Sequence, residues 1–302
     1  MTGPSTNPRV LIVTPEVTYL PGGMGQNSNG LNAKAGGLAD VSAALINALY
    51  NQGADVHVAL PDYRSIFNGH LSSHVRRELS AIRKSVPDER IHLAQDRAFF
   101  YRDYIYSGCE FENIKVSLAF QREVINNIVP RVQPDLIHCN DWTTGLIPAM
   151  ARQLDIPCLF TIHNIHTVKS LLSEIEDSGI DGASFWHNLF FEQFPSNYEN
   201  TRDSIPIDFL TSGVFAAHFV NTVSPQFLKE MVEGRHGFVK YSMQRELSNK
   251  SKAGCAVGIL NAPDPSFSPE FDDALICKYF AKNHVFGKKK NKRYLQKTLG
   301  LI

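Results

Sequence analysis

The sequence predicts an α/β fold: a Rossmann-like, mostly parallel sheet with helices on both faces. Three observations support this prediction. Short β-rich runs alternate with helical patterns along the chain, as in βαβ units. Several of these runs are apolar throughout, which is expected of strands that are buried on both faces. A glycine-rich turn connects the first predicted strand to the first predicted helix, as in many sheets that bind phosphate groups.

The first half of the chain gives a clear order of elements. An apolar run predicts the first strand at Val10–Val13, and an amphipathic helix begins at Leu38. Between them, the segment Pro21–Gly30 has the composition of a flexible loop. Further strands are expected at Val56–Pro61 and, as a third candidate, at Val116–Phe120.

The second half continues the alternation. A helix with Val124, Ile128 and Val132 on one side precedes a strand at Leu136–His138, and another helix runs from about Gly145 to Leu154. Two more strands are expected at 158–162 and 218–223. The polar and aromatic stretch 169–208 is expected to lay helices and loops over the sheet.

Composition excludes several classes of function. Thirty basic residues balance thirty acidic ones, so no net field attracts nucleic acid or an anionic membrane, and the run Lys288–Lys290 is expected on a solvated helix face. Five scattered cysteines without a C-x-x-C motif favour a reduced, cytoplasmic protein. The N-terminus lacks the regions of a signal peptide, and no segment approaches the roughly 18 apolar residues that a membrane span needs.

The glycine-rich turn is the first candidate site. Lys34, Gly36 and Gly37 precede the helix, where glycines admit a ligand close to the backbone and the N–H groups that open the helix attract an anion. The spacing matches neither the dinucleotide fingerprint nor the nucleoside-triphosphate loop. A plain strand-to-helix turn is the alternative interpretation.

Three polar clusters follow predicted strands: 138–142, 163–166 and 222–225. Ligands of open α/β sheets bind outside the carboxyl ends of the strands, so these clusters are expected to meet at one edge of the sheet. A zinc site on His138, Cys139, Asp141, His163 and His166 is disfavoured because their spacing fits neither a structural nor a catalytic zinc site. No G-x-S-x-G motif supports a serine hydrolase. We expect no metal and no cofactor.

Together, these motifs resemble the N-terminal half of the bacterial glycogen synthases and plant starch synthases, which are retaining glucosyltransferases of the GT-B architecture. They occur in the family's order and cover nearly the whole chain. The matching motifs are Lys-x-Gly-Gly-Leu at 34–38, His-x-x-Asp-Trp-x-x-Gly-Leu at 138–146, Thr-Ile-His-Asn at 161–164, Thr-Val-Ser-Pro at 222–225 and Gly-Ile-Leu-Asn at 258–261.

The resemblance implies an activity in glycogen biosynthesis and a set of site residues. Family enzymes transfer glucose from ADP-glucose to the non-reducing end of an α-1,4-glucan, with retention and without a metal. Asp141 and His163 match the catalytic positions, and Lys34, Gly36, Gly37 and Asn164 match substrate-binding positions. For Asp141, a helix N-cap ahead of Trp142 is the structural alternative.

Some family positions are altered. The usual His-Ala-His-Asp-Trp-His has Asn140 and Thr143 in place of its second and third histidines, Thr167-Val168-Lys169 replaces a Tyr-Gln-Gly, and Ala262 follows Asn261 where the family has glycine. These changes leave the identity of the acceptor undetermined. The sequence also does not show whether the donor is ADP-glucose or UDP-glucose. A GT-B transferase with a different acceptor and a non-catalytic module that binds a glucan or a nucleotide sugar remain as alternatives.

The resemblance also implies the domain organisation. Residues 1–284 are expected to form the N-terminal GT-B domain, and residues 285–302 a linker helix towards a C-terminal domain. That second domain, acting in cis or in trans, is the expected protein partner. Because it supplies most of the nucleotide contacts in GT-B enzymes, the chain alone is expected to be catalytically incomplete.

Overall fold

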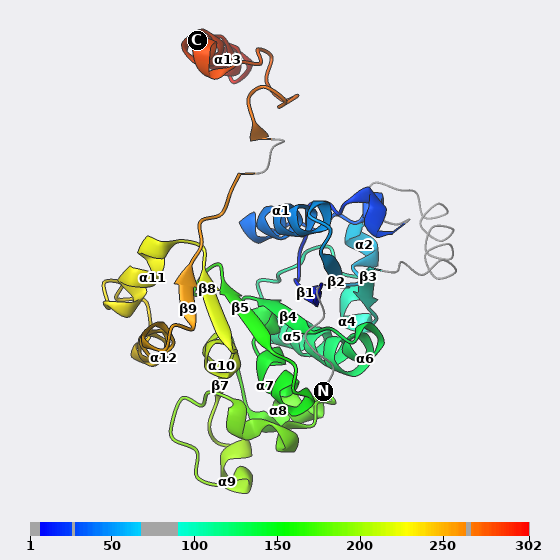
Figure 1. Cartoon of the computed structure of the whole chain (residues 1–302), viewed down its shortest axis with the longest axis vertical. Coiled ribbons are helices and arrows are strands. Elements are labelled where there is room, and N and C mark those ends of the chain that lie inside the picture. The colour runs from blue at the N-terminus through cyan, green and yellow to red at the C-terminus, as the bar shows by residue number, and fades with distance from the viewer. Residues whose placement is uncertain (1–6, 26–27, 68–89, 264–266, 302) are drawn as a thin grey trace. The chain divides into compact units, whose positions relative to one another are not determined.

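The computed structural model describes residues 7–25, 28–67, 90–263 and 267–301. The chain divides into two compact units, Met1–Asn261 and Ala262–Ile302. The first unit contains the large sheet, and the second contains helix α13 (His284–Thr298) (Figure 1). The predicted linker, residues 285–302, begins one residue after the start of α13. The Lys288–Lys290 run lies exposed on this helix, as predicted.

Within the described residues, seven parallel strands form the main sheet in the order β3-β2-β1-β4-β5-β8-β9. Strands β6 and β7 form a separate antiparallel pair. The bounds are β1 (Arg9–Val13), β2 (Asp55–Pro61), β3 (Ile91–Ala94), β4 (Leu136–Asn140), β5 (Cys158–Ile162), β6 (Lys169–Ser170), β7 (Ile207–Asp208), β8 (Phe219–Thr222) and β9 (Ala256–Gly258). The strand order reverses direction between β1 and β4, and such a switch point is where open α/β sheets bind ligands.

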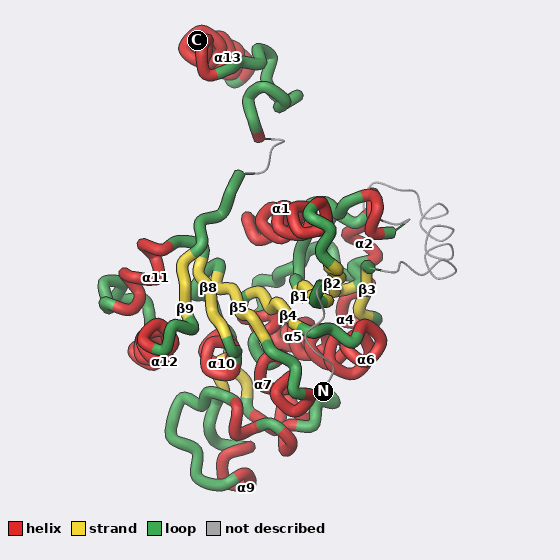
Figure 2. Tube along the Cα trace, viewed as in Figure 1, coloured by secondary structure: helices red, strands yellow, loops and turns green. Residues whose placement is uncertain are grey.

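Helices lie on both sides of the sheet (Figure 2). The α-helices are α1 (Gly37–Asn51), α2 (Arg64–Phe67), α4 (Arg97–Phe100), α5 (Glu110–Glu123), α6 (Val129–Val132), α7 (Ile147–Ala151), α8 (Leu172–Asp177), α9 (Tyr198–Arg202), α10 (Phe209–Ala216), α11 (Pro225–Val232), α12 (Tyr241–Lys252) and α13. A π-helical segment, η3 (Val124–Ile128), joins α5 to α6. The 3₁₀ turns are η1 (Gly22–Met24), η2 (Ser28–Gly30), η4 (Trp142–Thr144), η5 (Arg152–Leu154), η6 (Gly182–Ser184), η7 (Trp186–Asn188) and η9 (Ala281–Asn283).

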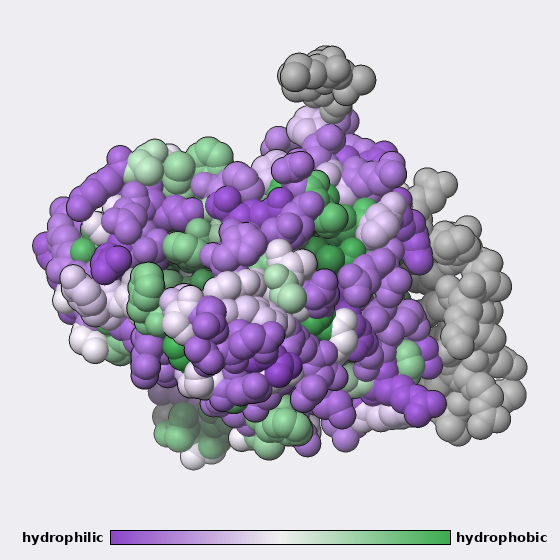
Figure 3. Space-filling view, turned by 90° about the horizontal axis from the view of Figure 1, so that it is seen from below, coloured by the Kyte–Doolittle hydropathy of each residue, from purple (hydrophilic) through white to green (hydrophobic). Residues whose placement is uncertain are grey.

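The central strands of the sheet are buried on both faces, as their continuous apolar runs predicted, whereas the edge strand β9 is partly exposed. Successive residues of a strand point to opposite faces. Leu11 and Val13 belong to the larger core, which also includes α5, α7 and α10, whereas Ile12 belongs to the smaller core, to which α1 contributes Ile46. Hydrophilic residues predominate on the face shown in Figure 3, where the hydrophobic residues form separate patches. No helix among the described residues is both long enough and apolar enough to cross a membrane.

The predicted strand at Val116–Phe120 was wrong, because these residues lie inside α5. Every residue from Ser117 to Gln121 is buried, so this part of the helix has no solvent-facing side and its apolar run resembles a buried strand. The third strand in sequence is β3 (Ile91–Ala94), a four-residue run that the sequence analysis did not identify.

The other predicted strands of the main sheet are confirmed to within two residues, and so is the helix α1. The helix expected from Gly145 to Leu154 consists of α7 and a 3₁₀ turn. The stretch 169–208 carries helices and loops as predicted, together with the short β6–β7 pair. In the predicted loop Pro21–Gly30, Met24 is buried in the smaller core, whereas residues 26–27 lie outside the described part.

Candidate active site

A cavity of about 630 Å³ lies where β1, β4 and β5 end, beside the N-terminus of α1. It brings together five of the six predicted site residues: Gly36, Gly37, Asp141, His163 and Asn164. Its other lining residues are Glu16, Ala35, Leu38, Val41, Tyr106, Ser107, Asn113, Trp142, His166, Val223 and Asn261. The three polar clusters predicted from the sequence therefore meet at one edge of the sheet, because each of them contributes to this lining.

The N-terminus of α1 forms one wall of the cavity. Gly36 is the N-cap residue, and Gly37 is the first residue of this fifteen-residue helix. The N–H groups of the first helical turn have no partner within the helix, and the helix dipole makes this end attractive to an anion. A Cβ at Gly36 or Gly37 would meet no protein atom within 4 Å. Glycine is therefore not needed at these two positions to avoid a clash within the protein. The absence of side chains at Gly36 and Gly37 instead leaves this wall of the cavity open.

Glu16 is a site residue that the sequence analysis missed. Its Oε2 accepts the N–H groups of Ala35 and Gly36 at 2.7 and 2.9 Å, and its Oε1 accepts the hydroxyl of Tyr106 at 3.1 Å. An internal carboxylate therefore holds part of the glycine loop, and Gly37 and Leu38 continue the cavity wall at the start of α1. Glu16 follows the first strand, so the rule that singled out the other strand ends would also have found it.

The Lys34 side chain forms an ion pair with Asp40. Its ammonium lies 2.7 Å from Oδ2 and 2.9 Å from Oδ1 of Asp40, in the first turn of α1. Asp40 also accepts the Thr18 hydroxyl at 2.7 Å. The Lys34 side chain is 42% exposed, and ion pairs this exposed stabilise a fold by only about 0.2–1 kcal/mol. Lys34 adjoins the cavity in sequence but is not among the residues that line it.

Asp141 adopts a strained backbone conformation just after β4. Its φ of 55° and ψ of −175° lie beside a region that is essentially restricted to glycine, where a residue costs on the order of 1–3 kcal/mol. Its side chain makes no capping hydrogen bond to η4, so the side-chain N-cap alternative is not supported. Instead, Oδ1 accepts the N–H of His163 at 2.7 Å and Oδ2 accepts the side-chain amide of Asn164 at 3.0 Å. Asp141 thus ties the end of β4 to the turn after β5.

The carboxyl of Asp141 titrates near neutrality. Burial raises its pKa to about 7, the hydrogen bonds from His163 and Asn164 oppose the rise, and the nearby Glu16 adds to it. A carboxyl group with such a pKa exchanges its proton in the physiological range. Perturbed groups of this kind cluster at functional sites.

The hydrogen bonds of Asn140 fix the tautomer of His163. The Asn140 amide nitrogen donates to the carbonyl of Val13 at 3.0 Å, so its Oδ1 faces Nε2 of His163, also at 3.0 Å. Nε2 must then carry the proton, and Nδ1 is the ring nitrogen left as an acceptor. Burial, with a smaller effect of His138, lowers the pKa of His163 to about 4, so the ring is neutral at pH 7. Asn140 belongs to the predicted polar cluster 138–142, and its residue type is one of the departures from the family motif.

His138 belongs to a buried chain of polar groups behind the cavity. Thr161 donates its hydroxyl proton to Asn221 at 2.5 Å and therefore accepts from Nε2 of His138 at 2.6 Å. Burial lowers the pKa of His138 to about 4. His138 does not line the cavity. Among the described residues, no three His, Cys, Asp or Glu side chains are placed to share a metal ion.

Comparison with known proteins agrees with the fold and the motifs. The family model of the starch synthase catalytic domain matches residues 9–244. A glycogen synthase of Syntrophotalea carbinolica is 29% identical over 297 residues, and one of Cellvibrio japonicus is 31% identical over 300 residues. Each match covers 89% of this chain and 57% of the relative, so the chain spans little more than half the length of these relatives.

Among solved structures, the fold resembles the catalytic domain of starch synthase IV from Arabidopsis thaliana, which was solved bound to ADP and acarbose. The TM-score is 0.69 at 22% identity, and the match covers 98% of this chain and 60% of that one. These findings confirm the resemblance to glycogen and starch synthases and the predicted fold class.

Proposed function

Because the chain belongs to the starch synthase catalytic domain family, we propose that it forms the N-terminal part of the active site of an α-glucan synthase. In this proposal, glucose passes from ADP-glucose, or from UDP-glucose, to the non-reducing end of an α-1,4-glucan, with retention of the anomeric configuration. Curated relatives named glycogen synthase support the glucosyl transfer. The ADP in the starch synthase IV structure supports the choice of donor.

The observation that carries the proposal is one cavity with two different walls. The N-terminus of α1 supplies the backbone N–H of Gly37, and a rim after β4 and β5 supplies Asp141, His163 and Asn164. An anionic diphosphate suits the first wall, and a neutral sugar with several hydroxyls suits the second. Without a metal, preorganised N–H groups and cations have to stabilise the charge that develops on the leaving diphosphate.

The rim residues take separate roles in this proposal. His163 is neutral and offers Nδ1 as an acceptor, so it orients a hydroxyl of the transferred glucose. Both carboxylate oxygens of Asp141 already hold the turn that carries His163 and Asn164. We therefore assign Asp141 the positioning of that turn, and Asn164 a contact to the donor. Lys34 would reach the diphosphate by exchanging its contact with Asp40 for a phosphate oxygen.

The C-terminal half of a GT-B enzyme completes the site in this proposal, either in cis or in trans. The described cavity presents the diphosphate with one helix end, and Lys34 is already paired with Asp40. Charge stabilisation is usually the largest catalytic contribution, so this half-site is expected to bind the donor without turning it over.

The test measures binding and transfer separately. The purified chain is expected to bind ADP in a calorimetric titration and to incorporate no radiolabelled glucose from ADP-glucose into glycogen. Addition of the C-terminal half of a bacterial glycogen synthase, as a fusion or as a second chain, is expected to restore incorporation. Turnover by the chain alone at the rate of a full-length synthase would contradict the half-site proposal. Glucan binding without turnover in the fusion would favour a non-catalytic module.

A further inference from the structure

Two positions of the family motif at 138–143 are altered in this chain, and both side chains are buried next to the candidate active site. Asn140 is the last residue of β4 and Thr143 belongs to η4; they are 3% and 6% exposed. The motif has histidine at both positions. A histidine can take up a proton between pH 5 and 8, whereas an amide and a hydroxyl cannot. The alteration therefore removes two titratable groups from the surroundings of His163.

The side chain of Asn140 connects the neighbouring strand β1 to the ring of His163. Its amide nitrogen donates to the carbonyl of Val13, the last residue of β1, at 3.0 Å. Its Oδ1 accepts the Nε2–H of His163 at 3.0 Å. The backbone N–H of His163 donates to Asp141 at 2.7 Å. Consecutive residues at the end of β4 therefore hold His163, one by its ring and the other by its backbone.

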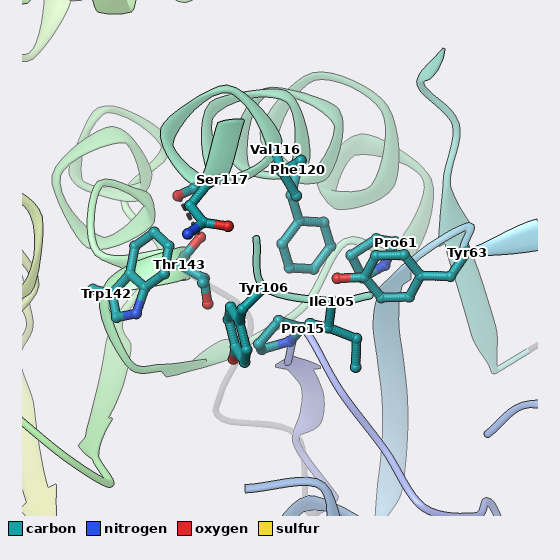
Figure 4. Close-up of a pocket in the computed structure, with 11 residues that line it drawn as sticks. Pro15, Pro61, Tyr63, Ile105, Tyr106, Val116, Ser117, Phe120, Trp142 and Thr143 are labelled. Atoms are coloured by element: carbon teal, nitrogen blue, oxygen red, sulfur yellow. Dashed lines mark hydrogen bonds between the residues drawn. The ribbon is translucent and has the colours of Figure 1, made fainter. Parts of the chain in front are cut away.

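Asn140 is itself held by the residues that follow it. The hydroxyls of Thr143 and Thr144 donate to its carbonyl at 3.4 and 3.0 Å. The carbonyl of Thr143 in turn accepts the hydroxyl of Ser117, on α5, at 3.1 Å. Figure 4 shows Ser117, Thr143 and Trp142 together at one end of a small pocket. Because these contacts order Asn140 before a substrate arrives, its amide orients the ring at little entropic cost.

The groups around the His163 ring keep it neutral. Burial and the nearby His138 lower the pKa of His163 to about 4. The carboxylate of Asp141 contacts the backbone N–H of His163, whereas the ring bonds to the uncharged amide of Asn140. The other titratable side chains that line the cavity are Glu16, Tyr106 and His166. A carboxylate at position 140 would instead contact the ring and favour the charged imidazolium.

From these contacts we propose that Asn140 is a positioning residue for glucosyl transfer, which directs Nδ1 of His163 to the sugar and keeps the ring uncharged. A neutral ring can accept a hydroxyl at Nδ1. An imidazolium would have no acceptor and would repel the positive charge that develops at the anomeric carbon. This inference rests on the proposed function, because it presumes that His163 contacts the transferred glucose. It assigns a role to a residue that departs from the family motif.

The first measurement follows the His163 ring in the chain itself by ¹⁵N NMR, with its signals identified by their absence from His163→Ala. In the unaltered chain, Nε2 is expected to carry the proton and the ring to stay neutral from pH 8 down to about pH 5. Asn140→Asp is expected to raise the titration midpoint by about 1–3 pH units, because a carboxylate in contact stabilises the imidazolium. Asn140→Ala removes the contact without adding a charge, so the ring is expected to exchange between both tautomers.

The second measurement follows transfer in a fusion with a C-terminal synthase half. Asn140→Ala is expected to lower kcat by about tenfold to a hundredfold and to change KM for the donor by less than about threefold, because it misplaces a group that acts in the transition state. Asn221→Ala is the matched control. Asn221, on β8, accepts the hydroxyl of Thr161 in the chain that ends at His138, away from the cavity lining. This control is expected to keep the His163 ring signals and kcat per folded molecule.

The outcomes separate this inference from the proposed function. A proton on Nδ1 of His163 in the unaltered chain, or unchanged ring signals in Asn140→Ala, would overturn the inference. A normal kcat per folded molecule in Asn140→Ala would overturn it as well, with the folded fraction taken from melting curves. A fusion that transfers no glucose, although its ring signals respond as expected, would count against the proposed function instead. If Asn140→Asp does not fold, Asn140→Ala still decides between these outcomes.

Discussion

Two pairs of histidines in or directly beside the main sheet differ in what their ring nitrogens face. His57 on β2 and His92 on β3 stack on each other, with Nδ1 of His57 at 3.0 Å from Nε2 of His92. Asp55 lies 3.3 Å from Nε2 of His57 and is itself paired with Arg9 and Arg90. Protein groups thus occupy three of the four ring nitrogens of this pair.

The pair at the carboxyl edge of the sheet is arranged differently. His138 is bonded to Thr161 behind the cavity, whereas His163 uses Nε2 for Asn140 and lines the cavity. Burial is the main cause that lowers the pKa of all four histidines. Of these four histidines, His163 is the one that lines the cavity, and a lowered pKa alone does not distinguish it from the histidines that bond only to other protein groups.

The largest expected effect comes from removing the histidine at the cavity. In a fusion of this chain with a C-terminal synthase half, His163→Ala is expected to lower kcat by about a hundredfold to a thousandfold and to change KM for the donor less. This is the typical loss for one preorganised group that acts mainly in the transition state. Initial rates normalised to the folded fraction measure it.

His57→Ala is the matched control for His163→Ala. It removes the hydrogen-bond partner of the buried His92, whereas Asp55 keeps Arg9 and Arg90. This loss is expected to lower the free energy of unfolding by about 1–3 kcal/mol while kcat per folded molecule stays normal. An unchanged kcat in His163→Ala would contradict the catalytic role of His163. A large loss of kcat in His57→Ala would contradict the purely structural role of His57.

Most of the fold, and some of the residues that line the cavity, could be predicted from the sequence. Apolar runs such as Val10–Val13 identified the central strands, because strands buried on both faces have no polar interruptions. The same reasoning failed at Val116–Phe120, because a helix covered on all sides has no interruptions either. Position after a strand selected the polar clusters that contain His163 and Asp141, and the resemblance to the family then singled out these two residues. Position could not assign Glu16 to the glycine loop, because their hydrogen bonds join residues nineteen and twenty positions apart.

Asp141 and His92 are expected to make the stability of the fold depend on pH in opposite directions. The folded-state pKa of Asp141 is raised to about 7 from its ordinary 3.8, so between these values the folded state binds more protons than the unfolded state. Its contribution to stability therefore falls as pH rises from about 4 to about 7. For His92, whose folded pKa is lowered to about 4 from 6.5, the unfolded state binds more protons, and stability falls as pH drops from about 6.5 to about 4.

Asp141→Asn isolates the Asp141 contribution. The variant loses one of the two hydrogen bonds that the Asp141 oxygens accept, and this cost is the same at every pH. Between pH 5 and pH 8, the stability of the variant relative to the unaltered chain is expected to rise by about 2–3 kcal/mol, because only the unaltered chain has to bury a charge at the higher pH. Urea unfolding at the two pH values measures the difference. Parallel stability curves for the two proteins would show that Asp141 does not titrate near neutrality.

The smallest expected effect concerns Lys34, which lies at the carboxyl edge but is already paired. If its ammonium moves from Asp40 to a donor phosphate, Lys34→Ala in the fusion protein weakens donor affinity by about tenfold, as expected for one charge-assisted contact. Stability is expected to change by less than about 1 kcal/mol, since the Lys34–Asp40 pair is partly exposed. Lys229→Ala is the control, because Lys229 lies 3.9 Å from Glu233 on the surface of α11 and does not line the cavity. Normal donor affinity with a lowered melting temperature in Lys34→Ala would instead make Lys34 a structural residue of the glycine loop, and phosphate binding would then rest on the N-terminus of α1 within this chain.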